Sequence, residues 1–500
     1  MTTSIESAHA RFMQLTEALK TDALPPPEVL QQYCDLAAAA ERLDTARQTL
    51  FFLKEKHPKD IGIHSRYITL CIQMGDGAEA MATIESMAGR MKLTDEFIDA
   101  ALSVRKRLGP TPLPKDKSDS LSLCMIARNE SKFMGACLLG VKPLIDEIIL
   151  VDTGSNDRTA DIGRLFGAQV FHFQWCDDFS AARNFGLSKA TGQWILILDA
   201  DEAIAPSEFA ALRALIRNHE KKSAAFAIET RNYCYTANTL GWMANSGRYP
   251  AHEAGLGWFP STKVRLFRRQ DQIQFHFPVH ERVEPSLRAA GIAVKPCKVP
   301  VHHYGHLNES RNQAKARKYF ELGIAKLEAM ADDPGAVREL AVQAGQLEKW
   351  PEALSLWQQL LRLRPGYPEA LINLAGACWQ LGQYTQSLEW ALRAVAADKG
   401  MKEAHFNEAL SHMMLAEFPT AQRILEELLK GNKDYVAAQF MLGVVYCASG
   451  KMDKGRGVFN HLKTTNARTA LPQALEDIGQ RLMKAGLAQA AENLKAICLA

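Results

Sequence analysis

Small residues recur every 34 positions in the C-terminal part of the chain, and this period constrains the possible folds more than any other feature. Apolar residues follow each small residue by four and by seven positions, so separate columns keep one register across four units. The same spacing separates Ala46 from Ala80 near the N-terminus. A period of this length, with small side chains where two helices touch, predicts paired helices stacked at both ends of the chain. The C-terminal column consists of Ala353, Ser387, Ala421 and Gly455.

Four short apolar runs lie between the two repeat regions, and segments with helical spacing separate them. The runs are residues 121–127, 148–151, 169–173 and 194–198. Short strands that alternate with helices predict βαβ units and a mostly parallel sheet. Ligands of such open sheets bind beyond the carboxyl ends of the strands. We therefore expect an α/β domain with its site where these runs end.

Acidic side chains follow two of the runs directly. The last run ends in Asp199, Ala200, Asp201 and Glu202. Carboxylates at the exit of a buried strand are costly unless they are neutralised, and a hard cation shared with a substrate phosphate is a common solution. A solvated junction between strand and loop is the alternative explanation for an isolated Asp-Xaa-Asp.

Four motifs, in this order, resemble those of a family 2 glycosyltransferase with the GT-A fold. They are residues 127–130, 151–157, 182–184 and 199–202, and the resemblance covers about residues 120–319. One departure concerns Asp152, which Thr153 follows where many relatives carry two adjacent acids. The resemblance therefore implies that Asp152 alone recognises the base, and the motif does not set the identity of the base.

The resemblance implies a nucleotide-sugar donor and a Mn²⁺ or Mg²⁺ ion that bridges its two phosphates. Asp201 is the implied metal ligand, and His303 would complete the metal site with its imidazole, although a packing role is the alternative for this histidine. The chain has no Gly-rich phosphate loop, so we expect the metal to carry the phosphate charge. The implied donor-binding residues are Ala127, Arg128, Asn129, Glu130, Asp152, Asp157, Arg183, Asp199 and Ala200.

Direct displacement at the anomeric carbon needs a base that takes the acceptor proton. Glu281 is the candidate base, and His280 is the second choice. Residues 229–259 concentrate Tyr, Trp and Phe, which predicts either a β-hairpin that packs on the sheet or an aromatic platform for the acceptor.

The predicted organisation is an α/β domain inserted between two all-α repeat regions that resemble tetratricopeptide repeats. The segments are an N-terminal repeat region (1–108), a Pro-rich linker (109–118), the GT-A domain (119–308), a linking helix (309–332) and C-terminal repeats (333–500). Such repeats supply concave surfaces. These surfaces could hold a protein or peptide acceptor, bind another subunit, or only stabilise the enzyme.

Charge and cysteine usage narrow the class of protein. A net charge of +3 gives no electrostatic case for nucleic acid. The ten cysteines occur singly, which suits buried thiols in a reducing cytoplasm. No signal peptide and no apolar stretch of membrane-spanning length is evident, so we expect a cytoplasmic protein without a transmembrane segment. The sequence does not indicate an oligomeric state.

The first functional hypothesis is a metal-dependent, inverting glycosyltransferase that uses a UDP-linked or other nucleotide-activated sugar. Its acceptor would be a protein, such as a flagellin or another surface protein, with a polysaccharide or lipid-linked glycan as the alternative. A sugar nucleotidyltransferase is a second hypothesis, but it calls for a Gly-rich basic loop after the first strand. A third is a non-catalytic repeat scaffold with a decayed transferase domain.

Overall fold

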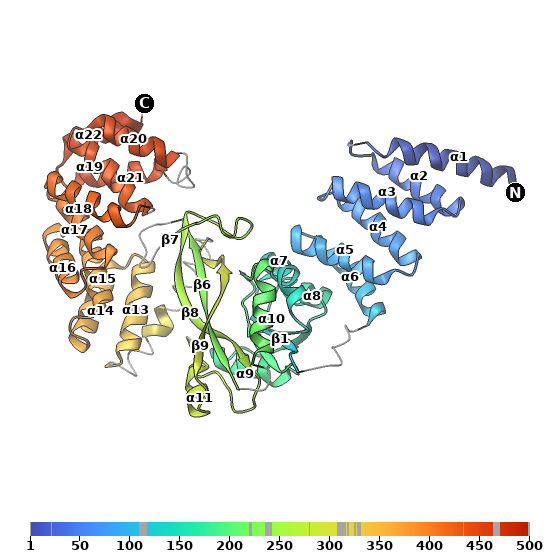
Figure 1. The fold of residues 1–500 in the computed structure, drawn as a ribbon, viewed down its shortest axis with the longest axis horizontal. Helices are drawn as coiled ribbons and strands as arrows, with labels where there is room; N and C mark the ends of the chain where they lie inside the picture. Colours follow the sequence, from blue (N-terminus) through green and yellow to red (C-terminus); the bar gives the residue numbers. More distant parts are fainter. Residues whose placement is uncertain are drawn as a thin grey trace. The chain divides into compact units, whose positions relative to one another are not determined.

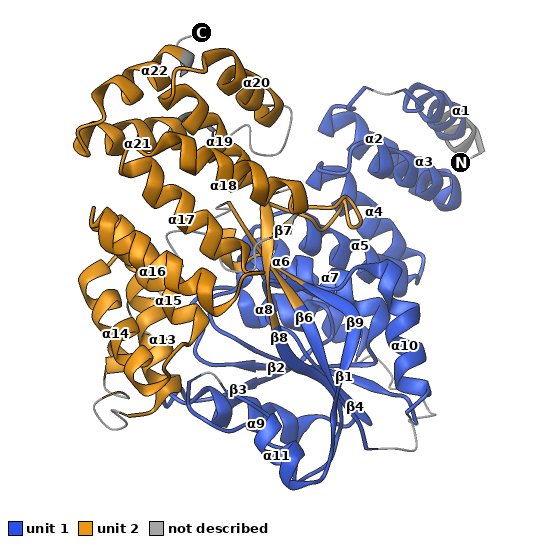
Figure 2. Ribbon diagram, turned by 60° about the vertical axis from the view of Figure 1, so that its left-hand side comes forward, with its two compact units in different colours: residues 1–229, 262–301 blue, residues 230–261, 302–500 orange. Residues whose placement is uncertain are grey.

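The computed structural model describes residues 2–21, 23–109, 118–219, 223–235, 243–279, 281–307, 317, 320–324, 327, 332–433, 435–463 and 471–498. Contacts between residues divide the chain into two compact units (Figure 2). Unit 1 comprises residues 1–229 and 262–301, and unit 2 comprises residues 230–261 and 302–500. The predicted α/β domain with helical repeat regions on both sides is confirmed (Figure 1).

Unit 1 begins with paired helices that follow the repeat pattern. The small residues Ala46 and Ala80 are fully buried where neighbouring helices meet. Several of these helices begin at a polar cap, as when the Asp60 carboxylate accepts a hydrogen bond from Ile63 N at 2.8 Å. The helices are α1 (Thr2–Ala18), α2 (Pro27–Ala39), α3 (Leu43–Lys56), α4 (Ile61–Gln73), α5 (Gly77–Arg90) and α6 (Asp95–Leu108).

The central sheet is mixed and, among the described residues, has nine strands. Its order is β3-β2-β1-β4-β8-β6-β9-β5, and β7 pairs with β8. Strands β1 to β4 pair in parallel, as the alternation of apolar runs and helices predicts, and β8 then joins β4 antiparallel. The strands are β1 (Leu121–Ala127), β2 (Glu147–Asp152), β3 (Gln169–His172), β4 (Trp194–Ile197), β5 (Glu202–Ala203), β6 (Ala225–Cys234), β7 (Met243–Ala244), β8 (Gly257–Arg268) and β9 (Val294–His303).

Helices of the α/β region lie between these strands in the chain. They are α7 (Ser131–Val141), α8 (Thr159–Leu165), α9 (Phe179–Lys189), α10 (Phe209–Arg217) and α11 (Glu284–Ala289), with 3₁₀ turns at Lys142–Leu144, Pro206–Glu208 and Gly305–Leu307.

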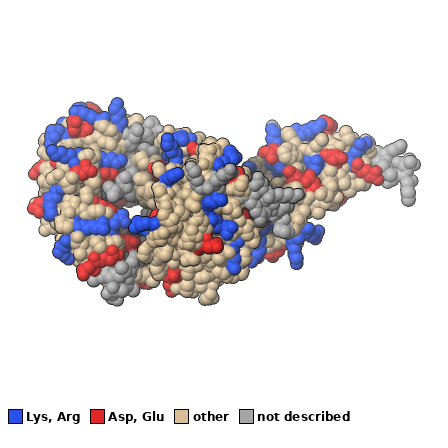
Figure 3. Space-filling view, turned by 60° about the horizontal axis from the view of Figure 1, so that its bottom comes forward, with Lys and Arg blue, Asp and Glu red and all other residues tan. Residues whose placement is uncertain are grey.

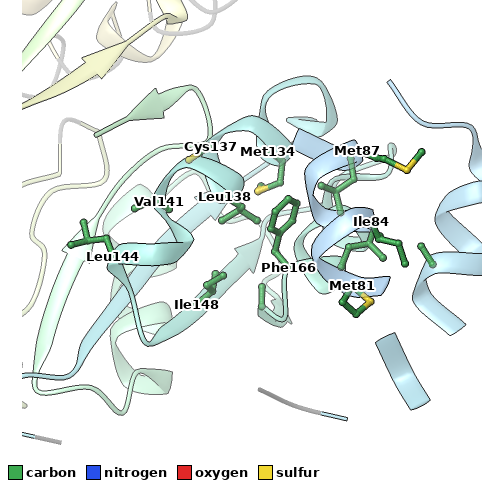
Figure 4. Packing of buried hydrophobic residues seen from close by; sticks show 14 of the residues in the cluster. Met81, Ile84, Met87, Met134, Cys137, Leu138, Val141, Leu144, Ile148 and Phe166 are labelled. Carbon is green, nitrogen blue, oxygen red and sulfur yellow. The ribbon is translucent and has the colours of Figure 1, made fainter. Parts of the chain in front are cut away.

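The N-terminal helices and the α/β region of unit 1 share one apolar core. Met81, Ile84 and Met87 of α5 belong to the same buried cluster as Met134 and Leu138 of α7 (Figure 4). Gly135 lets the two helices approach closely, since a Cβ there would lie 1.9 Å from Ala88 O. Unit 1 is therefore a single body in which repeat helices cover one helix of the α/β region.

Unit 2 contains the C-terminal helices, and the predicted columns are buried in it. Ala353, Ser387 and Ala421 are at most 1% exposed, and Gly455 is buried against Cys447. The helices are α13 (Pro334–Gln346), α14 (Trp350–Leu363), α15 (Pro368–Gln380), α16 (Tyr384–Ala397), α17 (Lys402–Met414), α18 (Phe418–Gly431), α19 (Val436–Ala448), α20 (Met452–Lys463), α21 (Leu471–Lys484) and α22 (Ala488–Cys498).

The aromatic segment also belongs mostly to unit 2, where it packs rather than faces solvent. Tyr233, Tyr249 and Trp258 are at most 5% exposed, whereas Tyr235 is 56% exposed. Met243 of β7 pairs antiparallel with Trp258 of β8, as the hairpin alternative predicts. Trp242 lies outside the described residues.

On the face drawn in Figure 3, Lys and Arg side chains are interspersed with Asp and Glu side chains. Within the described ranges, every helix is too short or too polar to cross a membrane.

Candidate active site

The parallel register brings the carboxyl ends of β1, β2, β3 and β4 to one edge of the sheet. Ala127 pairs with Asp152, and Asp152 pairs with His172. Strand β4 lies on the other side of β1 and ends at Ile197, two residues before Asp199. The predicted donor-binding residues of the first, second and fourth strands therefore follow neighbouring strands at this edge.

Two loops at this edge are tied together by hydrogen bonds. Asn129 has a positive φ of 56°, its backbone N donates to Ser155 Oγ at 3.0 Å, and its side-chain oxygen accepts from Asn156 N at 2.7 Å. Glu130 N donates to Thr159 Oγ1 at 2.7 Å. Ala127 O accepts from Thr153 N at 3.0 Å. These hydrogen bonds hold the 128–131 loop in one conformation. The Arg128 side chain is exposed.

Asp157 uses its carboxylate within the loops. One oxygen accepts from Thr159 N at 3.0 Å, and the other accepts from Ser131 N at 3.2 Å. Burial acts to raise the pKa of Asp157, but the hydrogen bonds from Thr159 and Ser131 outweigh it and lower this pKa. In this structure Asp157 fastens the two loops to each other, and its donor-binding role remains a prediction.

Asp152 is 3% exposed and is held on both oxygens. Oδ1 accepts from Ser155 N at 3.0 Å and from Ser155 Oγ at 2.6 Å. Oδ2 lies 3.1 Å from His172 Nδ1, and the His172 side chain is 67% exposed. The carboxylate predicted to read a base is thus buried beside an accessible imidazole.

A buried ion pair closes the turn that carries the clustered acids. Asp199 N donates to Glu202 Oε2 at 2.9 Å, and Glu202 N donates to Asp199 O at 3.1 Å. Arg265 of β8 grips the Glu202 carboxylate with two hydrogen bonds of 2.6 and 2.5 Å, and both side chains are 2% exposed. Two fully buried opposite charges with bidentate geometry fix this turn in one conformation.

Arg183 of α9 joins two predicted site residues from distant parts of the chain. Its NH2 donates to Asp199 Oδ1 at 2.8 Å, and its Nε donates to Glu281 Oε1 at 3.2 Å. The Arg183 side chain is 7% exposed, and its NH1 group is buried without a hydrogen-bond partner among the described residues. Burial acts to lower the pKa of Arg183, but the carboxylates of Asp199 and Glu281 raise it. Burial likewise acts to raise the pKa of Asp199, but Arg183, with Lys263 and Arg265, holds it well below its ordinary value.

The acids of this turn offer few ligands for a metal ion. Among the described residues, no three His, Cys, Asp or Glu side chains come together as a metal-binding group. Asp199 Oδ2 accepts no hydrogen bond within the described chain, and the Asp199 side chain is 34% exposed, whereas Asp201 is 6% exposed. Mg²⁺ is commonly held by one or two carboxylates plus substrate phosphates, and the second oxygen of the partly exposed Asp199 carboxylate fits that mode.

The two histidines of the predicted site have different outcomes. His280 lies outside the described residues. His303 belongs to unit 2, where its Nδ1 lies 2.8 Å from Asn232 Oδ1. Its neighbour His302 is fully buried and lies 2.8 Å from Tyr233 OH, and burial, with His252 and Arg231, lowers the pKa of His302 to about 3.

Three residues have roles at the site that the sequence does not predict. Arg265 and Lys263 occupy alternate positions of β8, which places them on one face of the strand. The positive charges of both side chains lower the pKa of Asp199. His172 reaches Asp152 only through the register of β2 and β3. The two-residue spacing of Lys263 and Arg265 can be seen in the sequence, whereas the register between β2 and β3 cannot be read from it.

Comparison with known proteins identifies the class of the central domain. Residues 122–280 match the model of glycosyl transferase family 2, and residues 338–402 and 406–470 match a tetratricopeptide repeat model. The chain therefore contains a family 2 glycosyltransferase domain, followed by tetratricopeptide repeats.

Curated relatives share parts of this organisation. A TPR repeat-containing protein of Synechococcus elongatus is 34% identical over 267 residues, which cover 51% of this chain and 59% of that protein. The SPbeta prophage-derived glycosyltransferase SunS of Bacillus subtilis is 30% identical over 207 residues, 40% of this chain and 44% of SunS. An uncharacterized glycosyltransferase of Rickettsia prowazekii is 34% identical over 84 residues, 17% of this chain and 28% of that protein. The matches thus span about half of the first two relatives and less of the third.

Proposed function

We propose that this chain is a metal-dependent, inverting glycosyltransferase that moves a sugar from a UDP-linked donor to an acceptor. The observation that carries this proposal is the bridge from Asp199 through Arg183 to Glu281. One guanidinium holds the carboxylate that would face the donor ribose or metal and the carboxylate that would act as base. A displacement reaction needs such a fixed separation between donor and base.

Glu281 is suited to take the acceptor proton. Its Oε1 is held by Arg183 Nε, and its Oε2 accepts no hydrogen bond among the described residues. The carboxylate is therefore oriented by one oxygen while the other can meet an acceptor hydroxyl, amine or thiol.

Binding of the donor would use the neighbouring strand ends. Asp152 would accept a hydrogen bond from a base N–H, with the 127–130 loop beside it. Asp199 and Asp201 would hold Mn²⁺ or Mg²⁺ against the two phosphates. When bound, this ion would stabilise the negative charge of the departing nucleoside diphosphate.

The acceptor is proposed to be a protein or peptide held by the repeats, in the cytoplasm. Helical repeats present extended concave surfaces, and the chain has such repeats on both sides of the transferase domain.

The test is calorimetric titration of the purified protein with UDP, GDP and ADP, with and without Mn²⁺. We expect binding of UDP that requires Mn²⁺ and is lost in Asp201→Asn, whereas the exposed Asp453→Asn on α20 should bind like the wild type. Absence of binding by all three nucleotides in folded wild-type protein would refute the proposal.

Glu281→Gln separates the base from a binding residue. It should slow transfer by about 10²–10⁴-fold while leaving the Kd for UDP unchanged. An equal loss of UDP affinity would make Glu281 a donor-binding residue instead.

A further inference from the structure

The donor edge of the sheet is connected to the N-terminal repeats by charged side chains, beginning at Asp152. His172 contacts the buried Asp152 carboxylate through Nδ1 at 3.1 Å, and its Nε2 lies 3.3 Å from NH2 of Arg164. Two-thirds of the imidazole remains exposed at the edge where a base would approach Asp152. The position of His172 is therefore set from two sides, by Asp152 and by Arg164.

Helix α8 continues this connection away from the edge. Arg164 NH1 donates to Asp161 Oδ1 at 2.9 Å, and the other oxygen of Asp161 lies 3.1 Å from Arg158 Nε. The side chains alternate in sign, and Asp161 is shared by both arginines. Exposed ion pairs are weak one at a time, but a network of shared charges restricts each of its members.

Arg158 carries the network into the repeats. It donates from NH2 to Asp99 and lies 3.7 Å from Asp95, and both acids belong to α6. The hydrogen bond with Asp99 has the largest influence on the pKa of Arg158 and raises it. Burial acts to lower this pKa, and the nearby carboxylates of Asp161, Asp99 and Asp95 raise it further. Arg158 also lies between Asp157 and Thr159, the two residues that fasten the loops of the donor edge.

The second helix that follows a donor loop is also held by the repeats. Helix α7 packs on α5 through shared apolar side chains such as Met87 and Met134 (Figure 4). Gly135 lies against the backbone of Ala88, and Lys142 pairs with Glu85 of α5. On its other side, Cys137 of α7 donates to Asp199 O at 3.6 Å. Since α7 and α8 both rest on repeat helices within unit 1, the network joins parts of one body.

We propose that the N-terminal repeats are part of the donor-binding machinery, in which Asp95 and Asp99 position His172 for recognition of the donor base through Arg158, Asp161 and Arg164. His172 is the specificity-determining residue, and the other five are positioning residues. This inference rests on the proposed function, because it places the donor base at the sheet edge beside Asp152.

The test is a double-mutant cycle on the full chain between the two ends of the network, with UDP, ADP and inorganic pyrophosphate as probes in the presence of Mn²⁺. One arm is Asp95→Asn with Asp99→Asn, and the other is His172→Gln. Each arm should raise the Kd for UDP by about 2- to 30-fold and lower the preference for UDP over ADP. The combined variant should bind UDP no more weakly than His172→Gln alone, because the first arm acts through His172.

Pyrophosphate distinguishes positioning of the base site from general damage. Its Kd should be unchanged in every variant, since it reports only the phosphate and metal part of the site. Arg47→Gln, which removes a separate ion pair with Asp76 in the same repeats, should leave all three Kd values unchanged.

Three outcomes would overturn the inference. They are additive effects of the two arms, an equal loss of pyrophosphate binding in folded protein, or unchanged UDP binding in both arms. If wild-type protein binds pyrophosphate but none of the nucleotides, the proposed function fails and the inference fails with it. If wild-type protein binds UDP and the cycle is additive, only the inference fails.

Discussion

At the scale of single residues, the clustered acids are not equivalent, because each has a different partner. Glu202 forms a buried ion pair with Arg265, whereas Asp199 pairs with Arg183 and is partly exposed. Sequence alone places all of these acids at the end of one strand. It cannot assign their partners, because Arg265 and Arg183 come from distant segments.

Glu202→Gln should therefore destabilise the fold strongly. The substitution leaves the Arg265 guanidinium buried without its counter-charge, which typically costs about 3–5 kcal/mol. Urea unfolding should show this loss, and Glu427→Gln, which removes an exposed pair with Lys430, should leave the unfolding midpoint unchanged. A midpoint for Glu202→Gln equal to that of the wild type would show that the buried pair does not hold the turn.

Arg183→Met should change the pH dependence of UDP binding. In the wild type, the pKa of Asp199 is held below its ordinary value, so Asp199 stays ionised at mildly acidic pH. Its contribution to stability is present above its unfolded pKa of about 3.9 and is lost as the pH falls below it. Without Arg183, burial is opposed only by Lys263 and Arg265, so the pKa of Asp199 should lie higher than in the wild type and UDP affinity should begin to fall at a higher pH. Titrations between pH 4 and 8 would show this shift, and coincident acid limbs would contradict it.

At the scale of elements, the contact of α5 with α7 depends on the absence of a side chain at Gly135. A Cβ at Gly135 would meet Ala88 O at 1.9 Å, and a backbone oxygen cannot rotate away as a flexible side chain can. Gly140 lies on the same helix, and a Cβ there would meet nothing within 4 Å. The two glycines thus form a matched pair for a test of this contact.

Gly135→Ala should destabilise the protein by about 1–3 kcal/mol, because it forces α7 away from α5. Gly140→Ala should stabilise it by about 0.5–1 kcal/mol, because alanine restricts the unfolded chain and favours the helix. Thermal unfolding of both variants gives the comparison. Equal effects at the two positions would mean that α5 and α7 do not pack as described.

At the scale of the whole molecule, the architecture was predictable and the way its parts share cores was not. The 34-residue columns are read from sequence because the period repeats locally, and Ala46, Ala353 and Ser387 are buried as that period requires. The order of strands and helices is likewise local information. Met87 and Met134 join one buried cluster because two helix faces from distant parts of the sequence pack together, and no local sequence pattern predicts that contact.

This shared core leads to a prediction about removal of the N-terminal repeats. A chain that begins at residue 118 loses α5, so Met134 and Leu138 of α7 lose cover that is worth about 1.5–3 kcal/mol for each fully buried apolar side chain. We expect a lower thermal midpoint and stronger binding of an apolar fluorescent dye than in the full chain. A chain that lacks only residues 1–21 keeps α5 and α6 and should change much less. If the chain from residue 118 keeps the midpoint and dye binding of the full chain, the N-terminal repeats are an independent arm, and their role in donor binding would fail on structural grounds before any nucleotide is added.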